Sequence, residues 1–203
     1  PLLTRAVTPA DYGFLVISNN VLAVSSGICL LGLDIALITR LSESKRQEDA
    51  SQIIYSLLLA RIVLFAIQAL VIFCIAWLYA NESLLFYLLM ISAVQAIVAA
   101  ALSHFSQTLQ AFQKHSDRFK VEMIFLVVQF AVTVGLLYAT RMGVLVVPVA
   151  GLLASFVALI FAALAVWPYF RADFDIETIK SAVGFSAPLV ISSLALAFSF
   201  NGT

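Results

Sequence analysis

Two ionisable residues, Asp34 and Arg61, lie inside long apolar stretches of the sequence. An Asp or Arg at the centre of a membrane helix costs about 2.5 to 3.5 kcal/mol on insertion scales, so such residues mark structural or functional sites. Asp34 precedes Arg40 by six residues and Arg61 follows Gln52 by nine. At 1.5 Å per residue, the two lie about 9 and 13 Å from the polar segment between their stretches. If those stretches are consecutive antiparallel helices, the two side chains can meet as a buried ion pair.

Three interpretations of these charges are open. Arg61 could extend along its helix to reach the membrane surface, while Asp34 caps backbone groups near a helix end. The two could form a structural ion pair. Alternatively, they could face a water-filled passage and act in function.

Further polar side chains share helical faces with each other. Gln68 follows Arg61 by seven residues and therefore lies on the same face, whereas Gln95 and Ser106 share a face of the next apolar stretch. A central water-filled cavity and hydrogen bonding between helices explain these polar positions equally well. His104 falls opposite Gln95, and we expect it to be a hydrogen-bonded packing residue.

The composition shows which elements must position these residues. The chain has 203 residues, of which 63% are hydrophobic and 11% are charged, and its mean hydropathy is +1.08. Soluble domains are roughly 45–50% apolar and about 25% charged, so the composition excludes a soluble enzyme, a disordered chain and a nucleic-acid binder. Apolar runs of about 20 residues predict an all-α polytopic bundle. The five full spans and the partial sixth are expected at Tyr12–Ile38, Ile53–Ala80, Leu84–Phe112, Val121–Tyr138, Val144–Tyr169 and from Ile179 onward.

Lys and Arg residues are concentrated in every second loop between the predicted spans. The connections after the first, third and fifth spans hold eight of them, whereas the other two connections and the leading segment hold two. The positive-inside rule therefore places the richer side in the cytoplasm. The sequence starts at Pro1 rather than at Met and ends inside or just past an apolar run, so we expect a fragment of a longer membrane protein.

The spans also carry packing signals. Ala150, Ala154, Ala158 and Ala162 recur every four residues, which is typical of close helix packing in membranes. Pro188 should bend the last span. The two cysteines, Cys29 and Cys74, are interpreted as membrane-buried thiols rather than as a disulfide or a metal pair. No HExxH, GxSxG, P-loop or CxxC motif occurs in the sequence, so no enzymatic activity, cofactor or metal is expected.

Four segments together resemble bacterial polysaccharide flippases of the Wzx type, in the multidrug/oligosaccharidyl-lipid/polysaccharide exporter superfamily. They are PLLTRAVTPADYG at residues 1–13, LGLDIALITR at 31–40, AFQKHSDRFKVE at 111–122 and VGFSAPLVISSLA at 183–195. The order of these motifs and the number of spans match that family, and so does the orientation, in which residues 1–11 lie outside and a preceding helix would start in the cytoplasm.

The resemblance implies a transporter with two helical lobes around a central cavity. Residues 1–178 would supply helices two to six of the first lobe, and residues 179–203 would begin helix seven. Such proteins move an undecaprenyl-diphosphate-linked oligosaccharide across the bacterial inner membrane by alternating access. Arg61 would then contact the diphosphate, Gln68 and Gln95 would contact sugar or water, and Asp34 would couple transport to a cation. The alternatives are a cation-coupled drug antiporter of the same superfamily and a membrane glycan enzyme.

Overall fold

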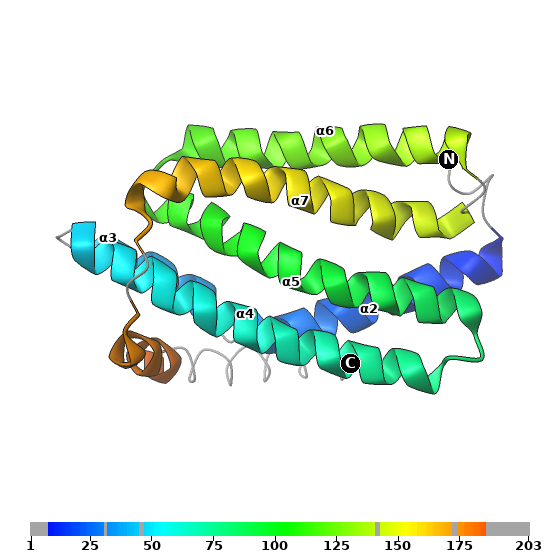
Figure 1. Ribbon diagram of the computed structural model, residues 1–203, viewed down its shortest axis with the longest axis horizontal. Coiled ribbons are helices and arrows are strands. Elements are labelled where there is room, and N and C mark those ends of the chain that lie inside the picture. Colours follow the sequence, from blue (N-terminus) through cyan, green and yellow to red (C-terminus); the bar gives the residue numbers. More distant parts are fainter. Residues whose placement is uncertain (1–7, 31, 45–46, 141–142, 172–173, 186–203) are drawn as a thin grey trace, which may run out of the picture.

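The computed structural model describes residues 8–30, 32–44, 47–140, 143–171 and 174–185. This part of the chain is helical apart from short connections (Figure 1). Its main elements are α2 (Pro9–Leu30), α3 (Leu33–Glu43), α4 (Gln47–Leu78), α5 (Ser83–Ala111), α6 (His115–Ala139) and α7 (Val146–Val166). Short 3-10 turns, η1 (Gly143–Leu145) and η2 (Trp167–Tyr169), flank α7, and residues 176–185 form a further helix.

Helix α5 is the centre of the bundle. It packs against α2, α3 and α4 on one side and against α6 and α7 on the other (Figure 1). The small-residue ridge of α7 forms part of this packing, since Ala150, Ala154, Ala158 and Ala162 are fully buried. Small side chains allow the helix backbones to approach closely, as the sequence predicts.

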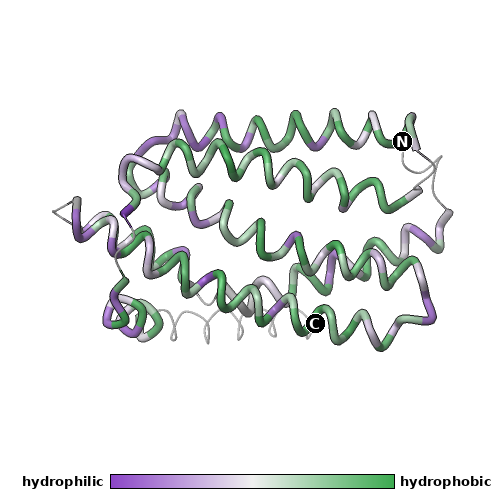
Figure 2. The backbone as a smooth tube through the Cα atoms, in the orientation of Figure 1, coloured by the Kyte–Doolittle hydropathy of each residue, from purple (hydrophilic) through white to green (hydrophobic). Residues whose placement is uncertain are grey.

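The helices are hydrophobic along most of their length (Figure 2), and many large apolar side chains lie on the outer surface of the bundle. Large side chains such as Trp77, Phe130 and Tyr138 are strongly exposed there. In the described part of the chain, four helices are long and apolar enough to cross a membrane: Glu48–Leu78, Ser83–Ala111, His115–Ala139 and Gly143–Tyr169. They match the second to fifth predicted spans, and the chain is a multi-pass membrane protein. Cys74 is an exposed free thiol on this surface, while the side chain of Cys29 lies outside the described residues.

The first predicted span is divided into two helices. A single helix was expected over Tyr12–Ile38, but α2 ends at Leu30 and α3 begins at Leu33. Gly32 between them has φ 68° and ψ 9°, a left-handed conformation that glycine adopts without steric cost. The break lies immediately before Asp34, which is the second residue of α3.

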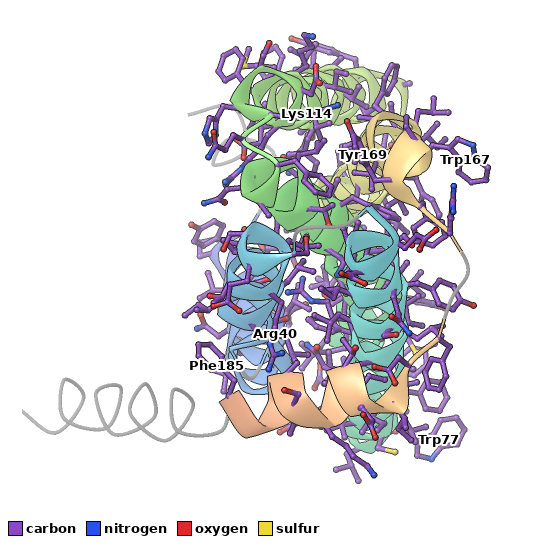
Figure 3. All side chains as sticks on the ribbon, turned by 90° about the vertical axis from the view of Figure 1, so that its left-hand side faces the viewer. Arg40, Trp77, Lys114, Trp167, Tyr169 and Phe185 are labelled. Atoms are coloured by element: carbon purple, nitrogen blue, oxygen red, sulfur yellow. The ribbon has the colours of Figure 1, made fainter. Side chains whose placement is uncertain are left out.

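The helix of residues 176–185 lies across the end of the bundle rather than along it (Figures 1 and 3). Residues 179–185 of the expected sixth span belong to this transverse helix, and the rest of that span, with Pro188, lies outside the described residues. Asp175 caps this helix by accepting hydrogen bonds from the Thr178 hydroxyl and from the N–H groups of Glu177 and Thr178. These bonds, led by that of the Thr178 hydroxyl, hold the pKa of the Asp175 carboxyl below its ordinary value.

One end of the bundle is rich in basic residues, and we call it the basic end. Among the described residues, every Lys and Arg except Arg61 belongs to an element or turn at that end: Arg40 in α3, Lys114, Arg118 and Lys120 at the turn from α5 into α6, Arg171 after η2, and Lys180 in the helix of residues 176–185. Figure 3 looks onto this end, where Lys114 lies over the ring of Tyr169 with Nζ 4.7 Å from its centroid. The loops that the sequence groups on one side thus meet at one end, and their cytoplasmic location stays a prediction.

Candidate functional site

Asp34 and Arg61 form an ion pair inside the bundle. Arg61 Nη2 donates a hydrogen bond to Asp34 Oδ1, which joins α4 to α3. The Arg61 side chain is fully buried, whereas the Asp34 side chain is 26% exposed. Of the three interpretations, this geometry matches the buried ion pair, because the guanidinium does not extend to the surface.

Local structure explains why Asp34 is suited to this position. It is the second residue of α3, in the first turn after the break at Gly32. The unpaired N–H groups of a helix N-terminus favour a carboxylate by about 0.3–1 kcal/mol. The break therefore places Asp34 in the first turn of a new helix, where the helix N-terminus stabilises the carboxylate that pairs with Arg61 of α4.

Arg61 retains hydrogen-bonding capacity beyond the pair. Its Nε and Nη1 atoms are buried and have no partner among the described residues. His104 of α5 is fully buried and close enough for the charge of Arg61 to act on its ring. Its Nε2 lies 2.9 Å from the carbonyl oxygen of Ile54, so Nε2 carries the hydrogen and Nδ1 is left as an unpaired acceptor. The interior around Arg61 thus holds two free donors and one free acceptor.

Gln68 lies on the same face of α4 as Arg61, about 10 Å further along the helix. Its side chain is buried, and Nε2 donates to the hydroxyls of Ser25 and Ser26 of α2 at 2.7 and 3.0 Å. Its Oε1 atom has no partner among the described residues. Gln68 is therefore engaged mainly in joining α2 to α4.

Gln95 lies on the opposite side of α5 from Arg61 and Gln68. With Ser106 it lines a groove of about 400 Å³ between α5 and α6, to which Ser155 of α7 also contributes. Gly151 of α7 leaves room for the amide, since a Cβ atom there would stand 3.1 Å from Gln95 Nε2. The three predicted substrate-binding residues therefore do not form one site. Arg61 and Gln68 lie on α4, on one side of α5, whereas Gln95 faces α6 and α7 on the other side.

Two charged residues that the sequence did not single out, Arg118 and Glu122, lie at the basic end of this groove. Glu122 lines the groove, and Arg118 Nε lies 2.8 Å from Glu122 Oε1. Arg118 also donates from Nη1 to Gln110 Oε1 of α5. The i,i+4 spacing of Arg118 and Glu122 is a recognisable signal for a helical ion pair, but it does not reveal which neighbouring helix the pair faces.

The whole chain matches one family model. Residues 2–203 match the model of a family described as polysaccharide biosynthesis protein. No curated protein and no solved structure shows a significant match to the chain.

Proposed function

This chain belongs to the polysaccharide biosynthesis protein family, and from that premise we propose that it is part of a lipid-linked oligosaccharide flippase. The protein would move undecaprenyl-diphosphate-linked units from the inner to the outer leaflet of the bacterial inner membrane by alternating access. The family and the multi-pass helical architecture support a transporter for cell-surface polysaccharide synthesis.

The observation that carries this proposal is a fully buried cation with spare donors. A diphosphate entering a low-dielectric interior needs a fixed positive charge and charge-assisted hydrogen bonds. Arg61 offers both, through its guanidinium and its unpaired Nε and Nη1 atoms. In the conformation described here Asp34 holds the guanidinium, so we assign diphosphate contact to another state of the transport cycle. Asp34, once released, is the proposed coupling carboxylate, and Gln68 and Gln95 are proposed to contact sugar or water.

The alternatives fit the described residues less well. A drug antiporter of the same superfamily is disfavoured by the family's description. A membrane glycan enzyme would be expected to place catalytic residues in a large extracytoplasmic loop. At the end opposite the basic end, however, α4 and α5 are joined by only residues 79–82.

The test is complementation of a flippase-deficient bacterial strain with the full-length protein. We expect Arg61→Ala to lower surface polysaccharide at least tenfold at unchanged membrane levels, and Arg61→Lys to retain part of it. Arg171→Ala is the control, because Arg171 is 72% exposed at the basic end. Failure of the wild-type protein to complement, although it is inserted, would refute the flippase.

A double variant separates binding from folding. Asp34→Asn combined with Arg61→Met removes both buried charges, so it restores any stability lost through an unpaired charge. If Arg61 contacts the diphosphate, the double variant stays inactive. Recovery of transport in the double variant would mean that the pair serves only the fold.

A further inference from the structure

The groove between α5 and α6 has polar side chains that lack partners. The amide of Gln95 and the hydroxyl of Ser106 make no hydrogen bond to any described residue, and both are partly exposed. Gln129 of α6 also lacks such a bond, and its Nε2 lies 3.7 Å from the position of a Cβ atom on Gly151. Two unpaired amides therefore converge on one point of α7.

The amides of Gln95 and Gln129 lie far from the helix ends. Gln95 is 12 residues into α5 and Gln129 is 14 residues into α6, or about 18 and 21 Å at 1.5 Å per residue. An amide left without a partner in hydrocarbon costs roughly 2–7 kcal/mol. Water or a polar ligand removes that cost and an acyl chain does not, so the positions of Gln95 and Gln129 favour water or a polar ligand over lipid.

From this, we propose that the groove is a carbohydrate-binding site that receives the glycan of the transported molecule, an inference that rests on the proposed function. Amide and hydroxyl groups both donate and accept hydrogen bonds, as sugar hydroxyls require. Phe125 adds an apolar wall against which a sugar ring can pack.

The charges of the groove favour a neutral ligand over a phosphate. Glu122 is the charged residue in its described lining, and that carboxylate is paired with Arg118. Gln95 and Ser106 are 11 residues apart on one face of α5, so the polar column spans about 16 Å and can hold several sugar units. In the described conformation the groove is present while Asp34 holds the guanidinium of Arg61.

Cysteine labelling tests whether water fills the groove. In a cysteine-free variant of the full-length protein, Ser106→Cys should react with a membrane-impermeant thiosulfonate at least tenfold faster than Val127→Cys. Val127 is the control because it is 59% exposed on α6 and does not line the groove. Labelling of Ser106→Cys no faster than that of Val127→Cys would overturn the proposal.

Ligand occupancy is tested in cells. Labelling of Ser106→Cys should slow several-fold in a strain that makes the lipid-linked substrate, relative to an isogenic strain blocked in the first sugar-phosphate transfer. Equal rates would mean that the groove holds water but no glycan, which also overturns the proposal.

Transport provides the third measurement. Gln95→Leu should lower surface polysaccharide at least tenfold at normal membrane levels, and Gln95→Asn should retain part of the activity. Gln107→Leu is the matched control, because Gln107 lies on the same helix and its Oε1 also has no partner among the described residues, but it is outside the groove lining. If the wild-type protein complements and Gln95→Leu does so equally well, the groove is not a glycan site even though the flippase stands.

Discussion

Removal of one member of the Asp34–Arg61 pair should destabilise the protein unequally. Asp34→Asn leaves a fully buried guanidinium without its carboxylate, and breaking a buried pair in this way costs about 3–5 kcal/mol. Arg61→Met leaves a carboxylate that is 26% exposed and lies in the first turn of α3. We expect a smaller loss of about 1–2 kcal/mol there, because water and the helix N-terminus still stabilise the charge.

The double variant Asp34→Asn/Arg61→Met should be more stable than Asp34→Asn alone. No charge is then buried, so the two effects should be non-additive by about 2–3 kcal/mol, as for residues in direct contact. The assay is the free energy of unfolding of the full-length protein in mixed micelles, measured for all four members of the cycle. Asp117→Asn is the control, since its pair with Lys120 is exposed, and it should leave that free energy unchanged.

Two results would refute this reasoning. Additivity within about 0.5 kcal/mol would show that the side chains do not interact. If Arg61→Met cost more than Asp34→Asn, the burial of the guanidinium would not be the source of the penalty.

Three further predictions concern the elements that position these groups. Gly32→Ala should cost about 1–2 kcal/mol in the free energy of unfolding, because φ is 68° there, whereas Gly13→Ala, in open space within α2, should be neutral or stabilising. Ala154→Leu should destabilise the bundle by about 1–3 kcal/mol, since Ala154 is fully buried, and Leu153→Phe, on the exposed face, should be tolerated in the same unfolding assay. Asp175→Ala should speed amide hydrogen exchange in the first turn of the helix that it caps. Because its native pKa is lowered, the wild-type cap should persist above the ordinary carboxyl pKa and be lost as pH falls through the native value, while the alanine variant stays insensitive.

Much of the bundle could be predicted from local signals. A membrane helix must satisfy its backbone internally, so the lengths of the apolar runs predict α4 to α7 without knowledge of their partners. The meeting of Asp34 and Arg61 could be anticipated because both lie at similar depths on helices joined by one short loop. These inferences need only the rise per residue and the order of helices along the chain.

Other features depend on contacts that spacing does not specify. An isolated glycine in an apolar run is compatible with a continuous helix, so Gly32 gave no sign that it would adopt positive φ. The apolar run from Ile179 is typical of a span, yet Ala182 is buried in the core cluster that also contains Leu33, in a helix that lies across the bundle. Helical spacing placed Gln95 and Ser106 on one face but did not show that this face meets α6 and α7.

The two polar faces of α5 differ in how their groups are satisfied, and this difference bears on function. On the α4 side, His104 bonds the Ile54 carbonyl oxygen and Gln68 bonds serines of α2, although Arg61 Nε and Nη1, Gln68 Oε1 and His104 Nδ1 have no partner among the described residues. On the α6 side, the amides of Gln95 and Gln129 contribute no hydrogen bond to the packing of the described helices. A polar group that does not stabilise the fold but is costly in hydrocarbon needs an external partner. We therefore expect the α6 side of α5 to line a water-filled interior. The α4 side can contact an anion only after the Asp34–Arg61 pair opens.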